Sequence, residues 1–141
     1  MLERERKFKL KYLPEGLTPL KIKQGYLMIK GKKNLRIRII NDEVAYMTYK
    51  VSIKKDTKDE FEYQVPLVDA VEMYNKAEKR LEKTRYKTKL NGNTIDIDVY
   101  PNGLQVVEIE FENELRSEDI PDYCGEEITG ISKYSNTKIA K

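Results

Sequence analysis

The feature of this sequence that most restricts its fold is a strict alternation of apolar and charged residues. In residues 35–39, 95–99 and 107–111, every second residue is Leu, Ile, Val or Phe, and Arg, Asp or Glu lies between. Because successive side chains of a strand point to opposite faces, this period of two predicts strands with one apolar and one charged face. An antiparallel sheet with one solvated face would explain it. A closed barrel with charges lining a wet channel is the alternative.

Eight segments have this strand-like character, and short turns separate most of them. The turns contain Gly, Asn and Asp, which tolerate positive φ, and Asn91-Gly92 is the clearest hairpin signal. Short turns favour antiparallel neighbours. A chain of 141 residues is long enough for one core and too short for two, so we expect one domain over residues 1–141. The expected strands lie near residues 2–10, 21–30, 34–41, 44–53, 58–65, 83–90, 93–100 and 104–112.

One segment has helical periodicity instead. Between Pro66 and Lys83, apolar residues recur three to four positions apart, and Pro66 suits the first turn of a helix. We predict an amphipathic helix over residues 66–83, packed on the outside of the sheet, in an α+β fold that is mainly antiparallel β. The tail from Thr129 onward is polar and is expected to be irregular.

The composition excludes several kinds of chemistry. The sequence contains no histidine, and Cys124 is its one cysteine. Ser-His-Asp hydrolysis, Cys-His nucleophiles, histidine-ligated zinc, cysteine-ligated zinc clusters and an intramolecular disulfide are therefore ruled out. Any reaction must use carboxylates, Lys, Arg and a metal ion.

The charge is abundant but nearly balanced. Charged residues make up 36% of the chain, above the roughly 25% usual for soluble proteins, yet the net charge is only +3. This balance argues against a general nucleic-acid binder. The N-terminus lacks an apolar signal region, and no stretch approaches the roughly 20 apolar residues of a membrane span, so we expect a cytoplasmic protein without membrane contact.

Charged pairs at every second position indicate a binding site. Glu3, Glu5 and Lys7 would share one face of the first strand, and Glu108 and Glu110 would share one face of a late strand. The segments 36–38 and 83–87 have basic residues at alternate positions. Acidic and basic faces in one small domain suggest a site for a metal-bound polyanion.

These motifs resemble, in order along the chain, those of the CYTH superfamily, the triphosphate tunnel metalloenzymes. Glu3-Arg4-Glu5-Arg6-Lys7 is similar to the family's Glu-x-Glu-x-Lys signature, and Arg36-Ile37-Arg38 is similar to its Arg-x-Arg strand. Further similar segments are Gln24-Gly25-Tyr26-Leu27, Thr48-Tyr49-Lys50, Glu60-Phe61-Glu62-Tyr63, Lys83-Thr84-Arg85-Tyr86-Lys87, Asp96-Ile97-Asp98, Val107-Glu108-Ile109-Glu110, residues 125–130 and Tyr134-Ser135-Asn136. The family includes inorganic, thiamine and RNA triphosphatases and class IV adenylyl cyclases.

The resemblance implies a closed eight-stranded β-barrel that forms a triphosphate tunnel. Mg²⁺ or Mn²⁺ would be held by carboxylates, because hard cations prefer oxygen ligands. A second metal ion or one of the late glutamates, Glu108 or Glu110, would position and deprotonate the attacking water, and Lys50 would stabilise the leaving phosphate. The implied metal-binding residues are Glu3, Glu5, Glu62, Asp98, Glu108 and Glu110, with Asp96 and Glu60 as further candidates. The implied phosphate-binding residues are Lys7, Arg36, Arg38, Lys50, Arg85 and Lys87.

The function this predicts is metal-dependent hydrolysis of a terminal phosphoanhydride in tripolyphosphate or a nucleoside triphosphate. A non-catalytic triphosphate, polyphosphate or nucleotide receptor is the alternative from another class, and a class IV adenylyl cyclase ranks lower because no segment suggests a base-recognition insert. Residues do not distinguish the substrates, Mg²⁺ from Mn²⁺, or a monomer from a homodimer.

Two departures from the family pattern affect these expectations. Gln64 stands where the acidic alternation of Glu60 and Glu62 would continue, and only five residues follow Asn136. We therefore expect no C-terminal helix to close one mouth of the tunnel. An open tunnel would admit polyphosphate chains or, as the one nucleic-acid partner, a 5′-triphosphate RNA end. Tyr49 and Tyr86 could stack on bases, but alternation places them opposite the basic side chains, on the exterior.

Overall fold

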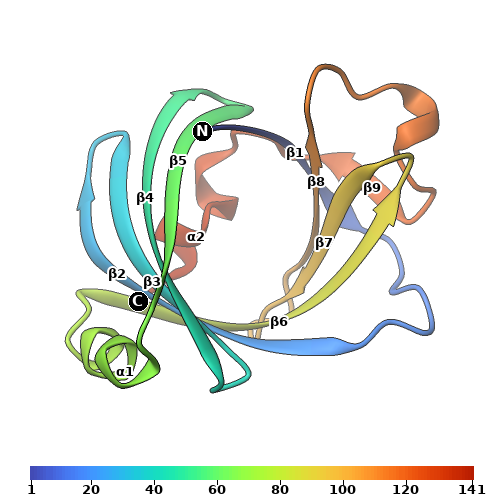
Figure 1. Cartoon of the computed structure of the whole chain (residues 1–141). Coiled ribbons are helices and arrows are strands. Elements are labelled where there is room, and N and C mark those ends of the chain that lie inside the picture. Colours follow the sequence, from blue (N-terminus) through green and yellow to red (C-terminus); the bar gives the residue numbers. More distant parts are fainter.

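The computed structural model of the protein describes residues 1–141 and consists mainly of one antiparallel sheet that closes into a ring (Figure 1). The strand order is β5-β4-β3-β2-β6-β7-β8-β1, and a pairing between β1 and β5 closes the ring. The predicted closed eight-stranded fold is therefore confirmed. The strands are β1 (Leu2–Leu10), β2 (Pro19–Lys30), β3 (Lys33–Ile40), β4 (Val44–Lys54), β5 (Thr57–Val65), β6 (Lys79–Leu90), β7 (Asn93–Val99), β8 (Gln105–Phe111) and β9 (Cys124–Glu127).

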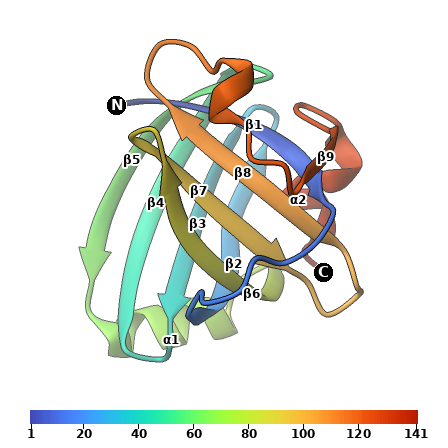
Figure 2. The same cartoon turned by 90° about the vertical axis from the view of Figure 1, so that its right-hand side faces the viewer.

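The ninth strand, β9, was not expected from the sequence. It lies outside the ring along β1, as Figure 2 shows, where Phe8 pairs with Glu127 and Leu10 pairs with Cys124. On that same edge, β1 pairs with β5 only through Leu2 to Arg4. The ring is therefore closed by a short seam, and the C-terminal chain lies beside β1 beyond it.

The hairpin turns have the predicted chemistry. Asn91 and Gly92 have φ values of 53° and 82°, and Asn41 and Asp42 have φ values of 52° and 54°. Two consecutive residues with positive φ match the twist of the flanking strands, and Asn, Asp and Gly are the residues that adopt this conformation at least cost.

The predicted helix is wrong in its extent. Helix α1 spans Leu67–Asn75, and β6 begins at Lys79. Leu81, which the helical spacing placed on the helix, is instead paired with Gln24 of β2 and is buried. The pairing of β6 with β2 satisfies the backbone groups of residues 79–86, and tertiary pairing of this kind overrides a weak helical preference.

The apolar faces of the strands point outward, where other segments cover them. Helix α1 places Ala70 over Ile37, Ile39 and Ala45. On the other side of the ring, residues of the chain between β8 and β9, such as Leu115 and Ile120, cover the faces of β1, β7 and β8. None of the helices has the length and apolar composition of a membrane-spanning segment.

The C-terminal tail corrects two expectations. It forms a 3₁₀ turn, η2 (Ser132–Tyr134), and a one-turn helix, α2 (Asn136–Ile139), which Figure 1 shows behind the opening of the ring. One end of the interior is filled by a buried apolar cluster of Tyr26, Leu81, Tyr100, Val106, Ile128 and Ala140, against which Ile139 packs. The tail therefore helps to close one end of the tunnel, which we expected to be open.

Candidate active site

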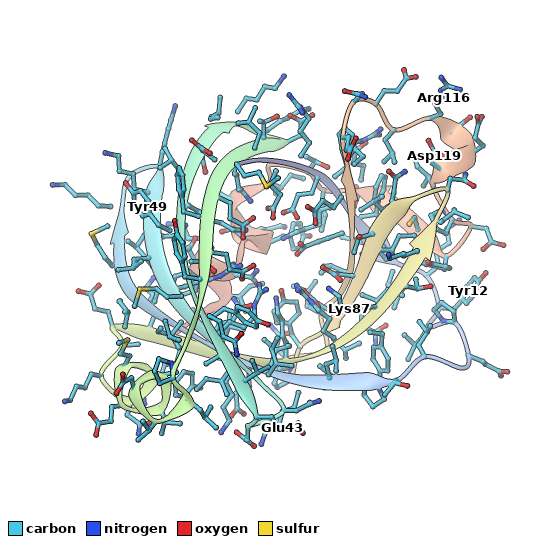
Figure 3. All side chains as sticks on the ribbon, in the orientation of Figure 1. Tyr12, Glu43, Tyr49, Lys87, Arg116 and Asp119 are labelled. Carbon is cyan, nitrogen blue, oxygen red and sulfur yellow. The ribbon has the colours of Figure 1, made fainter.

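The ring encloses a cavity of about 630 Å³ that is lined mainly by charged and polar side chains. In Figure 3 the sticks crowd the interior, where Lys87 is labelled, whereas Tyr49 and Glu43 lie outside. Every predicted site residue except Asp98 lines this cavity. They are Glu3, Glu5, Lys7, Arg36, Arg38, Lys50, Glu62, Arg85, Lys87, Glu108 and Glu110, and Glu60 and Asp96 line it as well.

One wall of the cavity concentrates carboxylates. On neighbouring strands β1 and β8, Glu5 lies directly opposite Glu110, a like-charge pair that destabilises a sheet. Burial and the nearby charge of Glu108 raise the pKa of Glu5, and burial together with Glu3 and Glu5 raises the pKa of Glu110. This wall would be stabilised by a cation.

Lysines partly neutralise this wall, although one carboxylate is left without a partner. Glu110 takes part in no ion pair or side-chain hydrogen bond. Burial alone would raise the pKa of Glu108, but Lys7, Lys83 and Arg85 hold it well below its usual range. The ion pairs of the wall are Lys50 with Glu3 at 3.2 Å, Lys58 with Glu5 at 3.5 Å and Lys7 with Glu108 at 3.5 Å.

The remaining walls gather three guanidinium groups. Burial, Arg36 and Arg85 together lower the pKa of Arg38 to about 10. The Arg36 Nε–H group is buried and has no hydrogen-bond partner, and its Nη2 lies 3.9 Å from Glu60. The Arg38 Nε–H donates to Gln24 Oε1 at 3.1 Å. Crowded cations with an unsatisfied donor suit a polyanion, because guanidinium binds phosphate oxygens in a fork.

Asp98 is placed differently from the other predicted metal ligands. Its two oxygens accept hydrogen bonds from Nε and Nη2 of Arg85, at 2.8 and 2.9 Å, and Lys83 Nζ lies 2.9 Å from Oδ2. Although burial opposes ionisation, Lys83 and Arg85 lower the pKa of Asp98 to about 2. The carboxylate is fully buried in the wall, where it orients Arg85.

Two lysines of the site were missed by the sequence analysis. Lys58 lines the cavity beside Glu5, and its alternation with Glu60 and Glu62 could have revealed it. Lys83 precedes Arg85 and Lys87 on the same face of β6, and it is buried with Asp98 and 5.7 Å from the ring of Tyr100. Burial lowers the pKa of Lys83 to about 7.

The carboxylate wall has the chemistry of a site for a hard divalent cation. Its donors are all oxygens, which Mg²⁺ and Mn²⁺ prefer, and the buried Oε1 of Glu108 has no hydrogen-bond partner. No three carboxylates converge closely enough to form a complete metal site as they stand. The lysine partners of Glu3, Glu5 and Glu108 would have to yield to a bound cation.

The fold and the cavity define the class of this protein as a closed antiparallel ring around an interior lined by acidic and basic side chains. The CYTH domain family model matches residues 1–141, and the chain belongs to this family. It is 33% identical over 124 residues to an inorganic triphosphatase of Acetivibrio thermocellus, a match that covers 84% of this chain and 79% of that protein.

Solved structures show the same fold. The inorganic triphosphatase NE1496 is 31% identical, with a TM-score of 0.67 over 98% of this chain and 93% of that chain. A conserved hypothetical protein from Pyrococcus furiosus superposes with a TM-score of 0.66 over 83% of both chains, at 24% identity. The similarity to the Pyrococcus furiosus protein concerns the fold alone.

Proposed function

We propose that this protein is a metal-dependent triphosphatase that hydrolyses the terminal phosphoanhydride of tripolyphosphate or of a nucleoside triphosphate. The observation that supports this most is the pair of opposed walls in one cavity: crowded guanidinium groups on one side and the Glu5–Glu110 pair on the other. The two relatives named inorganic triphosphatase support the same reaction class.

The basic residues would bind and orient the substrate. Arg36 and Arg38 on β3 and Arg85 on β6 would each donate to phosphate oxygens, while Lys7, Lys50 and Lys87 would act as point charges. Lys50 would stabilise the charge that develops on the leaving phosphate. Asp98 would act as a positioning residue, because it holds the guanidinium of Arg85 from behind.

The carboxylates would hold Mg²⁺ or Mn²⁺ and activate water. Glu3, Glu5 and Glu108 would be the main ligands, with Glu62, Glu60 and Asp96 as further contributors. When bound, the ion would neutralise charge on the transferred phosphoryl group. Glu110 is our candidate for the proton acceptor, because no lysine or arginine engages it.

Hydrolysis would be a single displacement by water at the terminal phosphorus. The water oxygen forms a bond to the terminal phosphorus, the bond from that phosphorus to the bridging oxygen breaks, and the bridging oxygen leaves with pyrophosphate or a nucleoside diphosphate. One water proton passes to Glu110. Most of the rate enhancement would come from positioning and from charges fixed in advance.

The test is phosphate release from tripolyphosphate, ATP, GTP, thiamine triphosphate and 5′-triphosphate RNA with Mg²⁺ or Mn²⁺. We expect Glu108→Gln/Glu110→Gln to lose about 10³-fold or more of the wild-type rate, because loss of a single group aimed at the reacting atoms commonly costs about 10²–10³-fold. The matched control is Glu43→Gln/Glu78→Gln, which removes the same charge from two exposed residues outside the cavity and should keep full activity.

A second measurement separates an enzyme from a receptor. If no substrate is hydrolysed while tripolyphosphate binds tightly and Arg36→Ala/Arg38→Ala abolishes that binding, the protein is a receptor and the proposal is wrong. If tripolyphosphate neither binds nor reacts, the tunnel has some other ligand.

A further inference from the structure

A second cavity, of about 380 Å³, opens beside the tunnel, and lysines dominate its walls. It lies at the seam of the ring, where β1 leaves β5 after Arg4 and the chain following β9 lies along β1 instead. Lys32, Lys54, Lys55 and Lys58 line it, together with the loop of residues 128–132. We call this cavity the seam groove.

Three of these lysines form no ion pair, although Lys55 is close enough to Glu127 to contribute to the lowered pKa of that carboxyl. Lys58 faces Glu5, but Lys32, Lys54 and Lys55 form no ion pair, and all three are exposed. Like charges that are held together without counter-charges create a positive potential, which attracts an anion into a concave surface. An anion with several charged groups would neutralise them best.

The groove is built from turns that are packed against each other. The Ser52 N–H donates to the carbonyl oxygen of Lys32 at 2.8 Å, so the β2–β3 turn is tied to the end of β4. Gly130 has a φ of +75°, and a Cβ at this position would lie 2.7 Å from the Cβ of Lys55. The loop can pack on Lys55 only because residue 130 lacks a side chain.

The groove adjoins the tunnel. Glu5, Lys7, Ser52, Lys58 and Ser135 line both cavities. One end of the interior is filled by the apolar cluster around Tyr26 and Tyr100, and Ile128 of that cluster also lines the groove. A linear polyanion too long for the tunnel would therefore find basic side chains next to the tunnel at the seam, whereas the apolar cluster offers its charges no partner.

We propose that the seam groove is a second phosphate-binding site, which binds the distal phosphates of a linear polyphosphate whose reacting end lies in the tunnel. This inference rests on the proposed function, because the tunnel must hold the reacting end. If the groove binds the distal phosphates, affinity depends on the length of the polyphosphate, and Lys32, Lys54 and Lys55 are the residues that bind the additional phosphates.

The test compares the binding of tripolyphosphate and of longer linear polyphosphates by calorimetry, with a chelator present so that no turnover occurs. Wild-type protein should bind the longer chains more tightly. Lys32→Ala/Lys54→Ala/Lys55→Ala should weaken the binding of longer chains about tenfold, the combined effect of three exposed ion pairs, and leave tripolyphosphate binding unchanged. The control is Lys11→Ala/Lys76→Ala/Lys89→Ala, which removes the same charge from exposed lysines outside both cavities.

Three outcomes would overturn the inference: equal wild-type affinity for short and long chains, an equal loss in the control variant, or binding of free phosphate in the groove with no advantage for longer chains. Thermal unfolding of each variant checks that the fold is intact. Failure of the proposed function has a different signature, since the wild type would then release no phosphate from tripolyphosphate with Mg²⁺ or Mn²⁺, whatever the binding data show.

Discussion

At the scale of single residues, Asp98 shows how an interior charge can serve the fold rather than the ligand. It is held by two cations, Lys83 and Arg85, and both Asp98 and Lys83 are inaccessible to solvent. The cost in free energy of unfolding differs between removal of the anion and removal of one of the cations. Removal of Asp98 leaves Arg85 without its bidentate partner and lowers the pKa of Lys83 further, whereas removal of Lys83 leaves the bidentate pair of Arg85 and Asp98 intact.

We therefore expect two substitutions that keep the side-chain volume to change the free energy of unfolding by unequal amounts. Asp98→Asn should lower the free energy of unfolding by about 3–5 kcal/mol, the usual cost of an uncompensated buried charge. Lys83→Met should change it by only about 0–1 kcal/mol, because Asp98 keeps Arg85 and the methionine fills a similar volume. Urea unfolding of both variants measures the difference, and equal losses would contradict the argument, because removal of Lys83 would then cost as much as removal of the anion that it shares with Arg85.

At the scale of elements, a surface ion pair contributes to the attachment of β9, which also pairs with β1 through the backbone. Arg6 donates to both carboxylate oxygens of Glu127, at 2.9 and 2.7 Å. The hydrogen bonds from Arg6 lower the pKa of Glu127 to about 2. Because the folded protein lowers this pKa below its ordinary value of 4.5, the stabilisation is fully present above about pH 4.5 and is lost as the pH falls through about 2.

The pH dependence of Glu127→Gln tests this attachment. Since the carboxylate is 38% exposed, solvent screening limits its contribution, and we expect a loss of about 0.5–1 kcal/mol at neutral pH. Urea unfolding from neutral pH down to about 2.5 should show the difference from wild type shrinking towards zero. Glu126→Gln, next to it and paired with Lys9 through a carboxylate that is 69% exposed, should lose less; a pH-independent loss in Glu127→Gln would contradict the argument.

The elements also show what the sequence could and could not predict. Alternation located the eight ring strands, most clearly β3, β7 and β8, in which apolar and charged residues alternate. It failed between Lys76 and Lys83, since Ala77 and Leu81 are four residues apart, a spacing that suits one face of a helix and one face of a strand equally. It missed β9 because Cys124–Glu127 has no apolar alternation, and its pairing with β1 comes from tertiary structure.

Alternation was more informative for the site than for the element boundaries. It fixes which residues of a strand share a face, so the inward direction of Arg36 and Arg38 or of Glu108 and Glu110 followed once the ring was assumed. It could not tell depth along the tunnel. Asp98 shares a face with Asp96, yet only Asp96 lines the cavity, because Asp98 is next to the buried end.

At the scale of the whole molecule, the interior is arranged for a ligand at the expense of stability. Arg36, Arg38 and Arg85 repel one another, and burial with this repulsion lowers the pKa of Arg38. Glu5 opposes Glu110 on the other wall. Functional sites often retain such unfavourable arrangements, which the bound ligand relieves. We therefore expect the free energy of unfolding of the ligand-free protein to be smaller than it would be without these like-charge contacts.

This predicts a thermal shift with a specific pattern among variants. Tripolyphosphate at about 100 times its Kd should stabilise the wild type by about 2.7 kcal/mol, which raises Tm by about 5–10 °C for a chain of this size. Arg38→Met should be about as stable as wild type without ligand, because relief of the repulsion from Arg36 and Arg85 offsets the lost hydrogen bond to Gln24, but it should lose most of the shift. Arg116→Met, which removes an exposed arginine on the outside of the ring (Figure 3), should keep the full shift. If Arg38→Met instead melted well below the wild type without ligand, Arg38 would stabilise the fold, and the crowded guanidinium groups would no longer indicate a ligand-binding wall.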